Sequence, residues 1–100
     1  MMDSSYAVTP KGRRLSTHAA NSLRRHGFRD LSEVDDVIDN PTRVTTQRDG
    51  ATVYIQRVIG RQRRYNLVIV GDTGIVTGMK NLRPNALRGL GQNHGFDPNP

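Results

Sequence analysis

The sequence contains no cysteine, and this absence excludes two classes of protein. Without thiols the chain forms neither a disulfide framework nor a thiolate metal site. No apolar run approaches the roughly 18 residues of a membrane span, and the polar segment 1–11 lacks the apolar stretch of a signal peptide. We therefore expect no membrane partner for this chain.

Lysine and acidic residues are also scarce. Lysine occurs only at positions 11 and 80, so 13 of the 15 cationic residues are arginines, against 9 acidic residues and a formal net charge of +6. Guanidinium groups match phosphate geometry with paired hydrogen bonds, whereas lysine acts as a point charge. This composition predicts a polyanionic partner, and a charge excess that binds nothing is the plain alternative.

The length of 100 residues fits one domain, since a second core would be too small to be stable alone. Residues 1–15 are expected to form a linker or disordered lead, and residues 16–90 the domain. Residues 91–100 are expected to form a flexible tail.

Two helices are predicted in the first half of the chain, over residues 16–26 and 32–39. The first begins with a serine and a threonine, which are both suitable N-terminal caps, and Gly27 stands where a left-handed C-terminal residue is expected. Ser32 caps the second helix, and the proline at position 41 prevents its continuation.

The alternation of apolar and polar residues after Pro41 predicts four strands, at residues 43–48, 51–59, 64–70 and 75–79. Short turns join them into an antiparallel meander. The predicted fold class is α+β, with two N-terminal helices packed on one face of a four-stranded antiparallel sheet. The other face is expected to be free for a ligand, and after Leu82 only a turn of helix near residues 85–90 is indicated.

Three histidines are candidates for acid–base chemistry, because histidine changes its charge near neutral pH. His18 lies at the boundary of the apolar face of the first helix, and Arg25 falls seven residues later on the same stripe. A histidine at such a boundary can be half-buried with its ring toward the sheet edge, which suits a general acid or base, and a hydrogen-bonded structural histidine is the alternative. His26 lies nearer the centre of the apolar face, where a structural role is favoured. His94 takes part only if the tail folds back.

The arginines gather in clusters, and the densest surrounds the turn at residues 60–63. Arg57 precedes this turn and continues the inward register of Val53 and Ile55, as does Ile59. An arginine at an inward position needs a carboxylate or a phosphate as partner, and we favour the phosphate. The alternative for the cluster is a solvated edge that prevents pairing between sheets.

Two tyrosines and a threonine complete the candidates. Tyr54 and Tyr65 lie on neighbouring strands, where each either stacks on a base or simply covers the sheet. Thr77 interrupts an apolar last strand, and its hydroxyl either bonds a phosphate oxygen or belongs to an ordinary strand residue.

Metal and nucleotide chemistry are not indicated. The aspartates at positions 35, 36 and 39 are typical of helix ends, and the histidines lack the spacing of metal ligands. The segment Gly89-Leu90-Gly91 follows no strand of a β-α-β unit. We therefore expect neither a metal nor another cofactor.

The order of several short motifs resembles that of a known family. The motifs are Ser16-Thr17-His18-Ala19-Ala20, Arg25-His26-Gly27-Phe28, a short acidic helix, Asn40-Pro41-Thr42-Arg43-Val44, and hairpins ending in Ile75-Val76-Thr77. Over residues 16–80 the chain is similar to the C-terminal toxin domains of contact-dependent growth inhibition proteins. These polymorphic toxin domains have the barnase–EndoU–colicin–RelE ribonuclease fold.

The resemblance implies a metal-independent ribonuclease that cleaves tRNA or another RNA. A base removes the proton of a ribose 2′-hydroxyl, the oxygen attacks the adjacent phosphate, and a 2′,3′-cyclic phosphate forms. The implied catalytic residues are His18 as base or acid, Arg25 and Arg57 on the phosphate, and Thr77 as a positioning group. The implied substrate-binding residues are Tyr54, Arg61, Arg63, Arg64, Tyr65 and Lys80.

The same resemblance implies a setting for the activity. The domain is expected to be secreted or displayed as part of a larger protein and to act in the cytoplasm of a target cell. An acidic immunity protein is expected to cover the basic site, and the domain is otherwise expected to be monomeric.

Two other functions stay open. A non-catalytic module that binds RNA or DNA would lose affinity steeply with salt, through counterion release, and would tolerate loss of His18. An interaction domain that docks an acidic protein would form a tight complex and show no affinity for nucleic acid.

Overall fold

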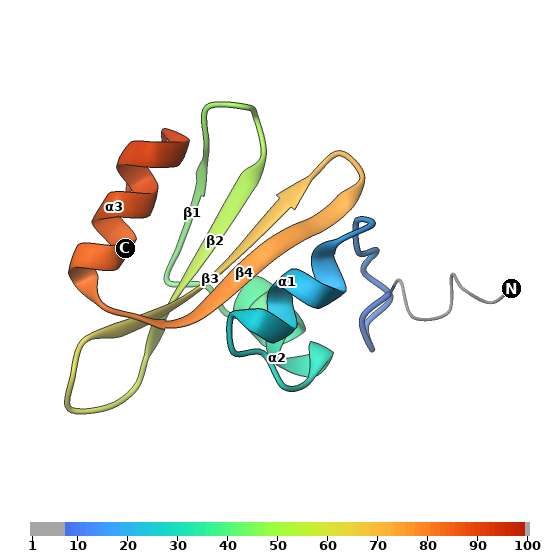
Figure 1. Ribbon diagram of the computed structural model, residues 1–100. Helices are drawn as coiled ribbons and strands as arrows, with labels where there is room; N and C mark the ends of the chain where they lie inside the picture. Colours follow the sequence, from blue (N-terminus) through green and yellow to red (C-terminus); the bar gives the residue numbers. More distant parts are fainter. Residues whose placement is uncertain (1–7, 100) are drawn as a thin grey trace, which may run out of the picture.

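The sheet is an antiparallel meander in which the order of strands in space follows the chain, β1-β2-β3-β4 (Figure 1). The structure, a computed structural model, describes residues 8–99. Its elements are α1 (Ala19–Arg25), α2 (Leu31–Asp39), β1 (Arg43–Thr46), β2 (Thr52–Val58), β3 (Arg64–Gly71), β4 (Gly74–Leu82) and α3 (Pro84–His94). The predicted α+β class and four-stranded meander are confirmed. Among the helices of this segment, none has the length and hydrophobicity of a membrane span.

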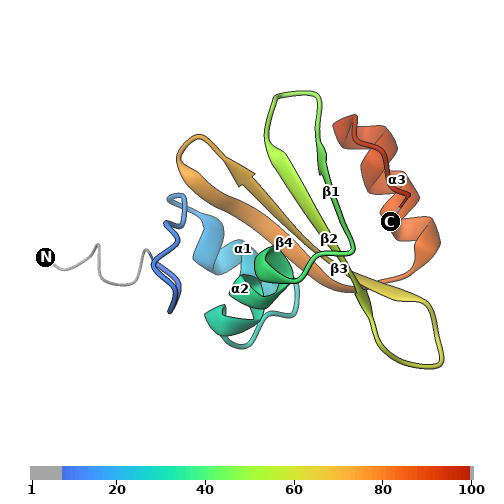
Figure 2. The same cartoon turned by 180° about the vertical axis from the view of Figure 1, so that it is seen from behind.

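Helices cover both faces of the sheet, so the face expected to be free is occupied. On one face α1 and α2 pack over a core that includes Leu23 and Val68. On the other face α3 packs over a second core, where Leu87 and Phe96 lie among the residues that include Leu67. Figures 1 and 2 show α3 across the sheet from α1 and α2.

The alternation along β2 explains the two cores, because successive side chains of a strand point to opposite faces. Val53 and Ile55 are fully buried on the side of α3. Tyr54, which lies between them, packs on the side of α1 and α2. Both faces of β2 are therefore covered, although only one face of the sheet was expected to be.

The segment expected to be a flexible tail is folded. The backbone N–H of Arg48 donates to the carbonyl of His94 at 2.9 Å, and Arg43 forms an ion pair with Asp97 at 2.7 Å. Phe96 is only 6% exposed. The compact domain thus continues beyond the expected boundary at residue 90.

The start of α1 differs from the prediction for a tertiary reason. The backbone N–H of Ser16 donates to the carbonyl of Ile75 at 2.8 Å, which draws this part of the chain alongside β4. The helix therefore begins at Ala19, with His18 at the N-cap position and no side-chain capping bond. Gly27 does adopt the predicted left-handed conformation, with φ of 102°.

The start of α2 is capped by a different residue from the one predicted. Asp30 is the N-cap, and its side chain accepts a hydrogen bond from the backbone N–H of Ser32. The Glu33 side chain in turn accepts a hydrogen bond from the backbone N–H of Asp30, which completes a capping box. The predicted end of the helix at Asp39 is confirmed.

The lead segment is anchored to α2 through Asp35. Thr9 Oγ1 and Arg13 Nη1 donate to one carboxylate oxygen at 2.7 and 2.9 Å, and the backbone N–H of Lys11 donates to the other at 3.0 Å. Asp35 is only 2% exposed. Burial raises its pKa, but these hydrogen bonds outweigh burial and hold the pKa below its usual value. The first part of the expected disordered lead, residues 1–7, lies outside the described residues.

Candidate active site

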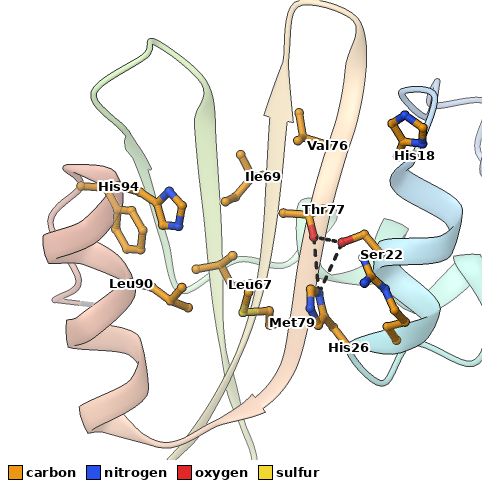
Figure 3. Close-up of a pocket in the computed structure, with 12 residues that line it drawn as sticks. His18, Ser22, His26, Leu67, Ile69, Val76, Thr77, Met79, Leu90 and His94 are labelled. Carbon is orange, nitrogen blue, oxygen red and sulfur yellow. Dashed lines mark hydrogen bonds between the residues drawn. The ribbon is translucent and has the colours of Figure 1, made fainter.

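A pocket of about 340 Å³ lies between α1 and α3, and all three histidines line it (Figure 3). Its floor is apolar and comes from β3 and β4, chiefly through Leu67, Ile69 and Met79. Its polar lining residues are His18, Ser22, Arg25, His26, Thr77 and His94. The pocket therefore combines an apolar floor with histidine, hydroxyl and arginine side chains on its walls.

A cluster of three polar side chains lies where α1 meets β4. Ser22 and His26 are one helical turn apart, so both face the strand. The hydroxyls of Ser22 and Thr77 are hydrogen-bonded to each other. The His26 Nδ1 atom lies 3.4 Å from Ser22 Oγ and 3.5 Å from Thr77 Oγ1. Figure 3 shows the three groups pointing toward one another.

The tautomer of His26 follows from its shortest contact. Its Nδ1 atom lies 3.0 Å from the carbonyl oxygen of Gly78. A carbonyl oxygen accepts hydrogen bonds and never donates them, so Nδ1 must carry the proton. In the neutral ring the lone pair is then on Nε2. Within residues 8–99 the ring's hydrogen bonds all involve Nδ1, which leaves Nε2 to a ligand.

Gly78 sets the distance between β4 and its neighbours. A Cβ atom at this position would meet the carbonyl oxygen of Leu67 at 2.8 Å. It would also meet the side chains of Leu23 and Phe28 at 2.9 Å each. The absence of a side chain thus allows α1 to pack closely on β4 and brings His26 to the strand carbonyl.

The remaining polar groups occupy the rim. His18 at the N-cap of α1 and Arg25 in its last turn are exposed, and His94 is exposed at the end of α3. In Figure 3 His94 lies across the apolar floor from His26. The structure therefore brings together the predicted residues His18, Arg25 and Thr77.

Three further residues of the pocket were not among the predicted site residues. From the sequence His26 is expected to be structural, His94 takes part only if the tail folds back, and Ser22 has no expected role. The four-residue spacing of Ser22 and His26 is a signal visible in the sequence. The position of His94 depends on α3, which the sequence indicated only as a short turn.

The other predicted catalytic arginine lies elsewhere. Arg57 is exposed near the end of β2 and lines no part of the histidine pocket. Ile59, expected inward on the same face, is 99% exposed. Arg57 does lie opposite Tyr65, which is buried in the core beneath α3, but the covering does not extend to Arg57 itself or to Ile59, and both are exposed. Arg61, Arg63 and Arg64 surround the same distant turn.

Three predicted substrate-binding residues are engaged within the fold. Tyr65 is only 5% exposed, and Tyr54 is half-buried beneath α2 and α1. The ammonium group of Lys80 pairs with Glu33 at 2.5 Å and lies 5.9 Å from the centre of the Phe28 ring. This pairing lowers the pKa of the Glu33 carboxyl.

Comparisons with protein-family models, curated proteins and solved structures find no match to this chain. Within residues 8–99 no three histidine or acidic side chains are placed to hold a metal ion. The function must therefore be inferred from the pocket itself.

Proposed function

We propose that this chain is a ribonuclease that needs no metal ion and whose active site is the histidine pocket. The observation that carries the proposal is the convergence of three histidines and Arg25 on one pocket, with the Nε2 lone pair of His26 left free. Cleavage of RNA at a 2′-hydroxyl requires one base, one acid and a cation for the phosphate. The pocket holds side chains of all three kinds.

In the proposed reaction Nε2 of His26 removes the proton from a ribose 2′-hydroxyl. The 2′ oxygen forms a bond to the adjacent phosphorus, and the bond between phosphorus and the 5′ oxygen breaks. A proton from His94, across the floor from His26, passes to the departing 5′ oxygen. The products are a 2′,3′-cyclic phosphate and a 5′-hydroxyl, and no metal ion enters the balance.

The remaining polar groups have supporting roles in this proposal. Arg25 stabilises the negative charge that develops on the phosphoryl oxygens, an electrostatic role that preorganised cations fill well. The hydroxyls of Ser22 and Thr77 hold the imidazole of His26 against β4. His18, at the start of α1, adds positive charge to the rim when it is protonated.

The resemblance to polymorphic toxin domains extends the proposal to a biological setting. The substrate would be tRNA or another RNA of a target cell, reached through delivery as part of a larger protein. An acidic immunity protein would cover the basic rim of the pocket. The substrate, the delivery and the immunity protein are all proposed from the order of sequence motifs. Cleavage of RNA is the first of these proposals to test.

The test is cleavage of total tRNA by purified protein in the presence of a metal chelator. The key variant is His26→Asn, whose side-chain amide takes the place of Nδ1–H and donates to Gly78 but offers no base. We expect wild-type protein to produce 2′,3′-cyclic ends, and His26→Asn to be folded and slower by about 10²-fold or more.

Two results would contradict the proposal. If His26→Asn cleaves as well as the wild type, His26 only supports the fold. If wild-type protein leaves RNA intact with and without divalent metals, the chain is not a ribonuclease.

A non-catalytic nucleic-acid-binding module is the second candidate. It is favoured by the exposed arginines of the β2–β3 turn, which lie away from the histidines. Such a module would bind RNA without cleaving it, and His26→Asn would leave its affinity unchanged.

A further inference from the structure

A cleft of about 520 Å³ lies between the β2–β3 turn and the beginning of α3. Its lining residues are Gln62, Arg63, Arg64, Arg83, Pro84 and Asn85. Half of them are arginines, and none is acidic. The cleft shares no residue with the histidine pocket.

The three arginines of the cleft have no carboxylate partner in the described part of the chain. Within residues 8–99 only two arginines form such ion pairs, Arg13 with Asp35 and Asp39, and Arg43 with Asp97. The cleft differs from the other unpaired arginines in that three of them line one concave surface, where their charges add and favour an external anion.

One guanidinium of the cleft is held in place. Arg64 Nη2 donates to Gln62 Oε1 at 2.6 Å, and Arg64 is half-buried. A guanidinium has five N–H donors, so this bond orients the group and leaves donors for a ligand. Arg63 and Arg83, which line the same cleft, are exposed. This combination of one hydrogen-bonded and two exposed cations is suited to successive phosphates of a nucleic acid backbone.

The helix start at the cleft adds to the positive potential. Arg83 is the N-cap of α3, no acidic residue occupies the first turn, and no side chain caps it. The first backbone N–H groups of a helix carry a partial positive charge. They therefore reinforce the preference of the arginines for an anion.

The hairpin beside the cleft has the character of a nucleic-acid-binding arm. Its turn projects from the body of the molecule (Figure 1). Ile59 on this turn is 99% exposed, and the exposed residues Arg57 and Arg61 flank it. An apolar side chain between arginines on a projecting β-ribbon is suited to contact a base while the cations bind phosphates.

We propose that this cleft, with the hairpin beside it, is a second RNA-binding site that selects substrates long enough to reach the histidine pocket. The proposal rests on the ribonuclease function proposed above. From Arg64 at the cleft to Ile69 in the pocket floor, β3 spans about 17 Å at its usual rise per residue. About five stacked nucleotides cover that distance. RNA shorter than this occupies the pocket alone.

The experiment compares two substrates and two triple variants. The substrates are a dinucleoside monophosphate and a single-stranded RNA of about 20 nucleotides, long enough to reach both sites. The cleft variant is Arg63→Gln/Arg64→Gln/Arg83→Gln. The matched control, Arg14→Gln/Arg24→Gln/Arg29→Gln, removes the same charge from exposed positions outside the cleft.

The measured quantity is the ratio of kcat/KM for the long RNA to kcat/KM for the dinucleotide. We expect the cleft variant to lower this ratio by about tenfold and the control variant to leave it unchanged. Loss of three phosphate contacts should also reduce the slope of log affinity against log salt by about 2, since each contact on a single strand contributes about 0.7.

Binding is separated from cleavage by measuring affinity for a fluorescent RNA of the same length. For this measurement all arginine substitutions are placed in a His26→Asn background. If the control variant weakens binding as much as the cleft variant, only net charge matters and the second site does not exist. The proposal of a second site would also fail if the cleft variant left the ratio of the two kcat/KM values unchanged. If wild-type protein binds RNA through the cleft but cleaves none, the ribonuclease proposal fails and the cleft remains an RNA site.

Discussion

His26 donates its Nδ1 proton to the carbonyl oxygen of Gly78, 3.0 Å away, so the backbone of β4 fixes the tautomer of a side chain on α1. The two residues are 52 positions apart in the chain. A backbone acceptor is held by the sheet itself, so it does not reorient as a side-chain acceptor would. The orientation of the proposed base therefore depends on close packing between one helix and one edge strand.

Replacement of Gly78 by alanine should disturb both stability and activity. The added methyl group meets a backbone carbonyl, which cannot move aside as a flexible side chain can. We expect the free energy of unfolding to fall by about 1–3 kcal/mol, and RNA cleavage to fall further than stability explains, because α1 is displaced from β4.

Gly89→Ala is the matched control, since a Cβ atom there meets nothing within 4 Å and the position lies inside α3. It should stabilise the protein by up to about 1 kcal/mol. Urea denaturation and initial cleavage rates measure both effects. Equal stability of the two variants would contradict the packing described for Gly78.

Removal of the Thr77 hydroxyl should affect the reaction more than the fold. Thr77→Val keeps the branched shape and deletes the group that bonds Ser22 and lies 3.5 Å from His26 Nδ1. We expect a loss of about 1 kcal/mol in stability. Cleavage should be slower by about tenfold, because small displacements of a catalytic group are costly. Thr77→Ser restores the hydroxyl and should recover most of the rate, and identical rates for the two variants would remove Thr77 from the site.

Asp35 should contribute stability at neutral pH that disappears in acid. Its pKa in the folded chain lies below the ordinary 3.8, so its contribution is complete above that value and is lost as the pH falls through the lower folded pKa. Asp35→Asn should lower the free energy of unfolding at neutral pH by about 2 kcal/mol and remove this part of the acid dependence. The pKa values of Glu33 and Asp39 are also lowered, so these residues account for part of the acid dependence that remains in Asp35→Asn.

The measurement for Asp35 is urea denaturation at a series of pH values between about 7 and 3. Asp72→Asn, on the exposed turn between β3 and β4, is the control and should leave the curve unchanged. Parallel curves for wild type and Asp35→Asn across this range would show that the network of Thr9, Lys11 and Arg13 adds no pH-dependent stability.

Phe96 tests whether the segment after α3 belongs to the domain. The side chain is 6% exposed in the core beneath α3, so Phe96→Ala should cost about 3–5 kcal/mol. Asn99→Ala, at an exposed position, should cost less than about 0.5 kcal/mol. Thermal or urea unfolding distinguishes them, and a neutral Phe96→Ala would mean that the segment is not packed as described.

The strands were predictable because their signal is local, whereas α3 was not. Alternation along residues 51–59 and 64–70 needs only neighbouring positions to be recognised. The α3 segment begins with Pro84 and contains Gly89 and Gly91, and glycine favours helices poorly. Leu87 and Leu90 do have helical spacing, but beside two glycines this spacing indicates only a short turn. Burial of these side chains against the sheet holds α3 in place.

The candidate site was predictable in part for the same reason. The boundary position of His18 and the inward register of Arg57 both follow from periodicity. Periodicity does not tell where a covering helix ends, so Arg57 was assigned to a buried side that is open to solvent there. The position of His26 on the apolar face was recognised, but its partner Gly78 lies on a distant strand.

The walls of the pocket come from α1 and α3, and the whole sheet lies between them in the chain. On a ribosome, a nascent polypeptide interrupted after β4 has a floor and one wall, and it lacks His94 altogether. The same holds for a chain cleaved in the connection before α3 and separated into two pieces. On the proposed mechanism, the capacity to cleave RNA therefore arises only once α3 has been synthesised, and a chain interrupted after β4 should leave the RNA around it intact.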